Sequence, residues 1–166
     1  ETGMVLVTAP DVFQPEVLSL IDELTENYQK TEGIEYATGL TNTLEFTATD
    51  WGVEVGRLVR RDALPATATE VAALRRRVEA NPRLSGNVVS TDGTLAAIQL
   101  RFASGGDERQ TTNFATAQRV SRTTKELLLA RGSPDDVAVY FGGLPFLMYN
   151  MTVLIATNMA ILIPLM

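Results

Sequence analysis

The residues of this chain that could carry chemistry are carboxylates and hydroxyls, because the sequence contains no histidine and no cysteine. Serine–histidine–aspartate triads, cysteine–histidine pairs and most zinc sites are therefore excluded. The acidic residues that stand together are neighbours in sequence, in the pairs Asp22-Glu23, Asp107-Glu108 and Asp135-Asp136. Adjacent residues of a helix or strand do not face one another, so these pairs do not converge on one substrate atom. The sequence predicts no catalytic residue, no metal ligand and no cofactor.

Ser90 stands two residues before Asp92, in the segment "LSGNVVSTDGTLAAIQLRF". No base accompanies it that could activate a nucleophile. Two runs rich in β-forming residues flank Asp92-Gly93, and glycine supplies the positive φ that a tight turn requires. The segment therefore predicts a β-hairpin whose turn chemistry accounts for Ser90 and Asp92.

Composition limits the class of protein. With 166 residues, 45% hydrophobic residues and 20% charged residues, the chain is long enough to bury a core as one domain or two closely packed halves. The formal net charge of −6 argues against a nucleic-acid partner, because binding a phosphate backbone requires clustered Lys and Arg. The basic runs Arg60-Arg61 and Arg75-Arg76-Arg77 stand beside acidic residues and are interpreted as a solvated helix face.

The first half predicts a strand, a helix and a second strand. The leading residues 1–3 resemble a vector remnant or a short lead-in and are set aside. Residues 4–8 form an apolar run typical of a buried strand. A helix begins near Pro15 and ends at Gly33, with Val17, Ile21, Leu24 and Tyr28 at helical spacing, and "IEYATGL" follows as a strand. Residues 43–61 are left open between extended and looped structure.

The second half predicts helix, hairpin, helix and strand. Thr67 and Glu70 have the spacing of a capping box, so a helix begins there and stops at Asn81-Pro82. After the hairpin, a helix is expected over about 111–130 and a strand in "DVAVYFGG". Two strand–helix–strand units in one chain predict an α+β fold of the ferredoxin-like kind, with helices on one face of a mixed β-sheet.

The end of the chain is uncharged from Val137 to Met166. Gly142, Gly143 and Pro145 separate the last strand from a new helical run that is apolar nearly all round. Buried core helices usually contain shorter apolar stretches, of about 10–14 residues. Two interpretations stay open: the start of a membrane span from Asn158 onward, or a helix that packs in a core or dimer interface.

Three segments carry a resemblance to a known family: 5–43, 81–102 with its Asn-Pro and Ser-x-Asp-Gly elements, and 142–166 with Gly-Gly-x-Pro. Together they resemble the first extracytoplasmic loop of resistance-nodulation-division (RND) superfamily exporters. The similarity is greatest to the branch of the mycobacterial large membrane proteins (MMPL) and the hopanoid transporters. The resemblance implies a porter-type domain over 4–157 and the start of the second transmembrane helix over 158–166. Many relatives carry Asp where this chain has Asn158.

The resemblance also implies a function. The expected protein is a proton-driven exporter of the inner membrane. This segment of it would be extracytoplasmic (periplasmic) and would guide hydrophobic or amphipathic substrates, such as lipids and drugs, outward. The proton-relay carboxylates of such exporters would lie in other helices. Its partners would be the membrane, a lipid-like substrate and possible further copies in a homo-oligomer.

The segment 144–151 is expected to line the substrate path, because its flexible and aromatic side chains suit a promiscuous apolar site. The candidate residues are Phe146, Met148, Tyr149 and Met151. The competing interpretation is that these side chains pack beneath the sheet. The competing function is a soluble ferredoxin-like regulatory domain that binds a small ligand and dimerises through its apolar C-terminal helix.

Overall fold

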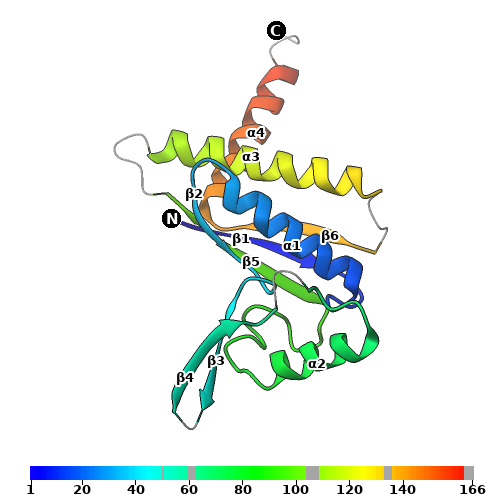
Figure 1. The fold of residues 1–166 in the computed structure, drawn as a ribbon. Coiled ribbons are helices and arrows are strands. Elements are labelled where there is room, and N and C mark those ends of the chain that lie inside the picture. Colours follow the sequence, from blue (N-terminus) through cyan, green and yellow to red (C-terminus); the bar gives the residue numbers. More distant parts are fainter. Residues whose placement is uncertain (50, 60–62, 104–108, 133–135, 163–166) are drawn as a thin grey trace.

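Four strands form the central sheet in the computed structural model of the protein, which describes residues 1–49, 51–59, 63–103, 109–132 and 136–162. Their order across the sheet is β2 (Ile34–Thr38), β5 (Leu95–Phe102), β1 (Thr2–Thr8) and β6 (Ala138–Gly142). Helices α1 (Pro15–Lys30) and α3 (Arg109–Ala130) lie on one side of it (Figure 1). The protein therefore has the expected α+β class.

The expected mixed sheet is wrong, because every pair of neighbouring strands in the central sheet is antiparallel. Strands β1 and β2 are joined through α1, but they are not neighbours: β5 lies between them and runs opposite to both. Strand β1 also begins at Thr2, which pairs with Arg101, so the fold uses residues that the sequence interpretation had set aside.

The core lies between the sheet and the helices. Val5 and Val7 of β1 are fully buried and pair with Ile98 and Ala96 of β5. On the opposite face of the sheet Arg101 is exposed, as is Tyr140. Alternation along the strands thus places one apolar face under α1 and α3.

A buried hydrogen-bond pair joins the two covering helices. The Tyr28 hydroxyl of α1 lies 2.6 Å from Oγ1 of Thr124 in α3, and both side chains are almost fully buried. Since the Thr124 hydroxyl already donates to the Val120 carbonyl oxygen, the Tyr28 hydroxyl is the donor to Thr124. Burial raises the pKa of Tyr28, and the bond to Thr124 opposes that rise only in part.

We expect Tyr28→Phe to lower the free energy of unfolding by about 1 kcal/mol, because Thr124 loses a buried donor. The loss should shrink above pH ~10, where the unfolded wild-type tyrosine ionises and the folded one does not. Urea titrations between pH 7 and 11 measure both effects. Tyr140→Phe, at a 57% exposed position, is the matched control. An equal loss in both variants would contradict the assigned role of the pair.

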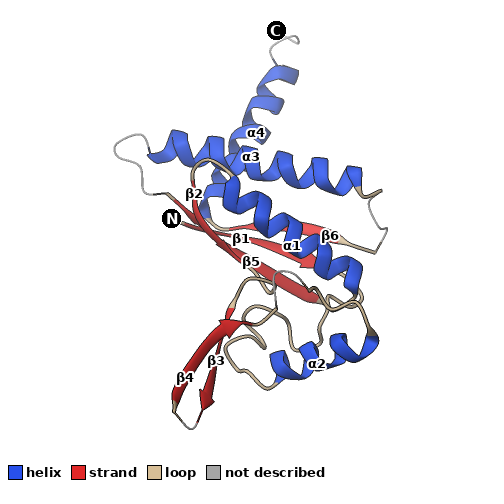
Figure 2. Cartoon of the chain, in the orientation of Figure 1, coloured by secondary structure: helices blue, strands red, loops and turns tan. Residues whose placement is uncertain are grey.

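A smaller unit stands beside the sheet. It contains the hairpin of β3 (Leu44–Thr49) and β4 (Gly52–Arg57) and helix α2 (Ala68–Glu79) (Figure 2). The capping box is confirmed: Oγ1 of Thr67 accepts from the backbone N–H of Glu70, whose carboxylate accepts from the Thr67 N–H. The hairpin projects from the body, and every described side chain of β4 is exposed.

The hairpin expected around Asp92-Gly93 is confirmed only at its turn and its second arm. Gly93 has a φ of +73° and its N–H donates to the Ser90 carbonyl oxygen. The first arm is reduced to a single bridge between Val89 and Ala96. Residues before it coil into turns, in which the Val88 N–H donates to the carbonyl oxygen of the buried Leu84.

Candidate functional site

Helix α4 (Leu144–Leu162) begins directly after strand β6, at a glycine turn. Gly143 has a φ of +97°, a conformation that L side chains rarely adopt. Phe146 in the first turn is 1% exposed and packs edge-on against Phe102, with ring centroids 5.8 Å apart, and against Phe141 at 5.0 Å. Phe146 therefore anchors α4 to the core of the sheet.

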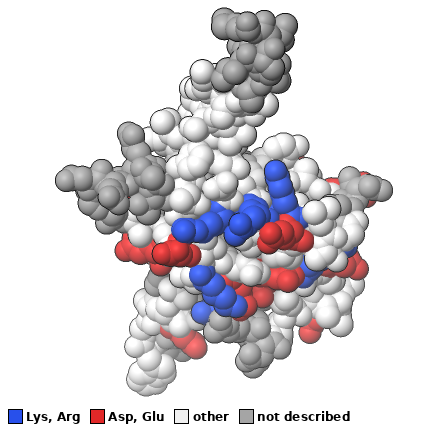
Figure 3. Space-filling view, turned by 90° about the horizontal axis from the view of Figure 1, so that it is seen from above, with Lys and Arg blue, Asp and Glu red and all other residues white. Residues whose placement is uncertain are grey.

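Beyond its first turns, α4 leaves the body of the protein (Figure 1). Every side chain described from Asn150 to Met159 is exposed. Many of them are large and apolar, with exposed fractions of 42–61%: Met151, Val153, Leu154, Ile155 and Met159. In Figure 3 the described part of the projecting helix shows no charged side chain, whereas acidic and basic side chains intermingle on the body.

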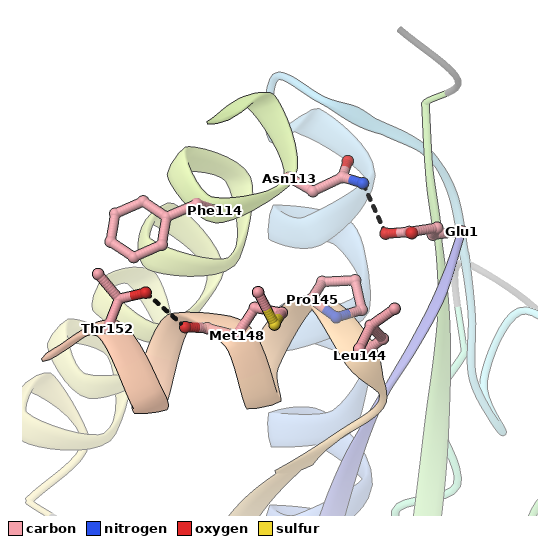
Figure 4. Close-up of a pocket in the computed structure, with 7 residues that line it drawn as sticks. All are labelled: Glu1, Asn113, Phe114, Leu144, Pro145, Met148 and Thr152. Atoms are coloured by element: carbon pink, nitrogen blue, oxygen red, sulfur yellow. Dashed lines mark hydrogen bonds between the residues drawn. The ribbon is translucent and has the colours of Figure 1, made fainter. Parts of the chain in front are cut away.

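A cavity of about 340 Å³ lies between α3 and α4. Asn113 and Phe114 contribute from α3, and Leu144, Pro145, Met148 and Thr152 contribute from α4 (Figure 4). Glu1, just before β1, closes one end. The volume is within the range of roughly 300–1,000 Å³ that is usual for small-molecule sites.

The cavity has a polar end and an apolar wall. At the polar end, the amide of the buried Asn113 donates to the Glu1 carboxylate at 2.7 Å. The Thr152 hydroxyl donates to the Met148 carbonyl oxygen at 2.9 Å, so it is satisfied within α4. Phe114, Leu144 and Met148 supply apolar surface. Such a cavity can accept an apolar group that carries a polar end.

The four candidate residues of the substrate path have different locations. Met148 lines the cavity. Tyr149 is half-buried and packs on Phe114, with ring centroids 5.3 Å apart. Phe146 packs in the core on the helix-covered face of the sheet, and Met151 is exposed away from the cavity lining.

Some lining residues were missed by sequence reasoning. Leu144 and Pro145 lie within the expected segment 144–151, but were not singled out. No sequence signal marks Asn113, and Phe114 was expected only as one residue of the helix over about 111–130. Glu1 was set aside with the lead-in, although its backbone oxygen accepts from Phe102 N–H in the sheet.

Three of the groups considered for chemistry, Ser90, Asp92 and Glu23, have structural partners. The Asp92 carboxylate accepts from the hydroxyls of Ser90 at 2.6 Å and Thr94 at 2.8 Å, and these bonds lower the pKa of Asp92 to about 2. Glu23 accepts from the Arg131 guanidinium at 2.8 Å. Asp107, Glu108 and Asp135 lie outside the described residues.

No helix of the structure, over its described residues, is both long enough and apolar enough to cross a membrane. Residues 163–166, which belong to the expected membrane span over 158–166, lie outside the described part of the chain. No protein-family model matches the sequence, and no curated protein is significantly similar to it. The exporter family thus stays a prediction from the sequence.

Proposed function

We propose that this chain is an extracytoplasmic domain of an RND-superfamily, MMPL-type exporter of the inner membrane, and that it guides hydrophobic or amphipathic substrates outward. The observation that carries the proposal is the cavity with an apolar wall between α3 and α4, at the base of an uncharged helix that projects from the body. An uncharged apolar helix is what a chain requires where it enters a bilayer.

The order of the strands supports a ferredoxin-like fold within the α+β class. The strands of the central sheet, numbered in chain order among themselves, are arranged 2-3-1-4, with helices in the first and last connections. We propose that this is a ferredoxin-like porter domain with the β3–β4 and α2 unit inserted between its halves. The inserted unit follows β2 and precedes β5.

The proposed substrate path runs along the wall formed by Leu144 and Met148. Met148 is 44% exposed and offers an adaptable thioether side chain. Motion of α4 against α3 would change the width of this cavity, because α3 and α4 form its two sides. Coupling to a proton gradient would need groups in other membrane helices.

Titration of the domain with the fluorescent hydrophobic amine N-phenyl-1-naphthylamine tests the path. We expect Met148→Asp to weaken binding about tenfold, because it places a charge on the apolar wall; tenfold corresponds to about 1.4 kcal/mol. Met151→Asp is the matched control, since Met151 is 50% exposed on the same helix but does not line the cavity. Equal effects of the two variants would refute a path through this cavity.

The exposed surface of α4 also favours a second function: a small-ligand-binding regulatory domain that dimerises through this helix. The exposed Leu147, Leu154 and Ile155 would then be covered by a second copy. Sedimentation of the wild type and of Leu154→Glu separates the two proposals. A concentration-dependent dimer that Leu154→Glu dissociates, while Met148→Asp leaves probe binding unchanged, would favour the regulator.

A further inference from the structure

A second pocket, independent of the proposed function, lies where α1 meets the turn after β2 and the end of β4. Its volume is about 200 Å³, which suits a ligand smaller than a drug-sized molecule. The described residues that line it are all polar or charged: Asp22, Thr25, Glu26, Gln29, Lys30, Thr41, Asn42 and Arg57. Helix α4 packs elsewhere, on α3, β1 and β6.

The pocket holds one acidic and one basic side chain without partners. Within the described part of the chain, Asp22 and Arg57 make no side-chain hydrogen bond and no ion pair, whereas Glu26 and Lys30 pair with each other at 3.5 Å. Asp22 is half-buried and Arg57 is exposed. The pocket therefore offers one site for a cation and one for an anion.

Thr41 supplies an unsatisfied polar atom in the same wall. The residue is 3% exposed, and its Oγ1 has no hydrogen-bond partner in the described structure. Neighbouring amides are already engaged: Asn42 accepts from the Gly39 N–H and donates to the Ala37 carbonyl oxygen, each at 2.8 Å. A buried hydroxyl without a partner is costly, and a bound ligand with a donor or acceptor would remove that cost.

We propose that this pocket binds a small zwitterion that carries a primary ammonium group and a carboxylate or phosphate. The ammonium contacts Asp22, the anionic group contacts the Arg57 guanidinium, and the Thr41 hydroxyl hydrogen-bonds to the ligand. Free amino-acid-like solutes and the headgroup of an ethanolamine phospholipid share this chemistry.

The first test compares zwitterions with smaller compounds that carry only one of the two charges. Each compound is titrated into the protein, and binding is measured from the shifts of backbone amide NMR signals. Glycine and O-phosphoethanolamine are expected to bind with dissociation constants on the order of 1–10 mM, a weak affinity that suits so small a ligand. Ethanolamine and acetate, which each carry one of the charges, should bind at least tenfold more weakly. The proposal would be overturned if acetate bound as tightly as glycine, or ethanolamine as tightly as O-phosphoethanolamine. It would also be overturned if no amide signal shifted at zwitterion concentrations up to about 50 mM.

The second test uses variants of the pocket. Asp22→Asn and Arg57→Gln should each weaken O-phosphoethanolamine binding at least tenfold. Thr41→Val should weaken it several-fold without lowering the melting temperature of the ligand-free domain, because it removes an unsatisfied hydroxyl. Glu79→Gln and Lys125→Gln remove the same charges at exposed positions outside the pocket lining and should stay within twofold of the wild type. Weakening by these controls equal to that of the pocket variants would show a net-charge effect and refute the site.

A third measurement separates the two ligand sources. Vesicles of phosphatidylcholine with and without phosphatidylethanolamine present the headgroup with and without ammonium N–H donors. Co-sedimentation that requires phosphatidylethanolamine, and that Asp22→Asn abolishes, would assign the zwitterion to a lipid. Binding of the free compounds with no vesicle binding would assign it to a solute.

Discussion

Replacing Phe146 with alanine is expected to lower the free energy of unfolding by about 3–5 kcal/mol, the usual cost of truncating a buried phenylalanine. Phe146 is 1% exposed and touches the rings of Phe102 and Phe141, so its removal leaves a cavity in the core between the sheet and the helices. It also removes the anchor of the first turn of α4. Urea denaturation followed by circular dichroism measures the change.

Leu147→Ala is the control for Phe146→Ala, because Leu147 is the next residue of the same helix and is 56% exposed. Its effect should be below about 0.5 kcal/mol. A Phe146→Ala variant as stable as Leu147→Ala would mean that α4 is not fixed to the sheet through this ring.

Gly143→Ala is expected to cost about 2–5 kcal/mol. An alanine here would keep the left-handed φ of +97°, a strain of roughly 1–2 kcal/mol. Its Cβ would also lie 2.8 Å from the Thr2 carbonyl oxygen and 3.0 Å from Cα of Gly3. Both contacts are with backbone, so relief requires β1 or the start of α4 to move, a further cost of about 1–3 kcal/mol.

The adjacent glycine provides the control for Gly143→Ala. Gly142 has no positive φ, and the nearest atom to an added Cβ is the Met4 carbonyl oxygen at 4.0 Å, an ordinary contact. Thermal denaturation should leave Gly142→Ala near the wild type and lower the melting temperature of Gly143→Ala by roughly 5–15 °C. Equal melting temperatures would contradict the assigned geometry of the turn.

Sequence patterns predicted the elements whose signals are local. The Thr67 and Glu70 capping box and the apolar spacing through Tyr28 depend on contacts within one helix or one helix face, and both are present. The sheet direction depends on which strands become neighbours. Strand β5 lies between β1 and β2 although it is far from both in the sequence, and local sequence patterns do not predict such pairing.

The site was only partly predicted because the sequence of α4 does not show which side of the helix is buried. Amphipathic helices reveal their buried side through periodicity, but α4 is apolar nearly all round. The sequence therefore identified the segment 144–151, yet it did not distinguish the buried Phe146 from Met148 in the cavity wall. Asn113 was missed because its role depends on contact with the start of β1.

The zwitterion pocket is likewise a product of tertiary structure. Asp22 belongs to α1 and Arg57 to the end of β4, and each alone is an ordinary charged residue. The pocket arises because the turn that contains Thr41 and the last residue of β4 lie next to α1. Its function is separable from that of the α3–α4 cavity, because the two pockets share none of their described lining residues.

Sequencing the encoding gene on both sides of this segment tests the exporter proposal most directly. The proposal predicts a run of about 20 apolar residues immediately before Met4, and a continuation of "NMAILIPLM" to a similar apolar length. It also predicts acidic residues within later membrane spans. A stop codon or a polar continuation directly after Met166 would contradict it, and the uncharged helix would then be explained by a soluble partner.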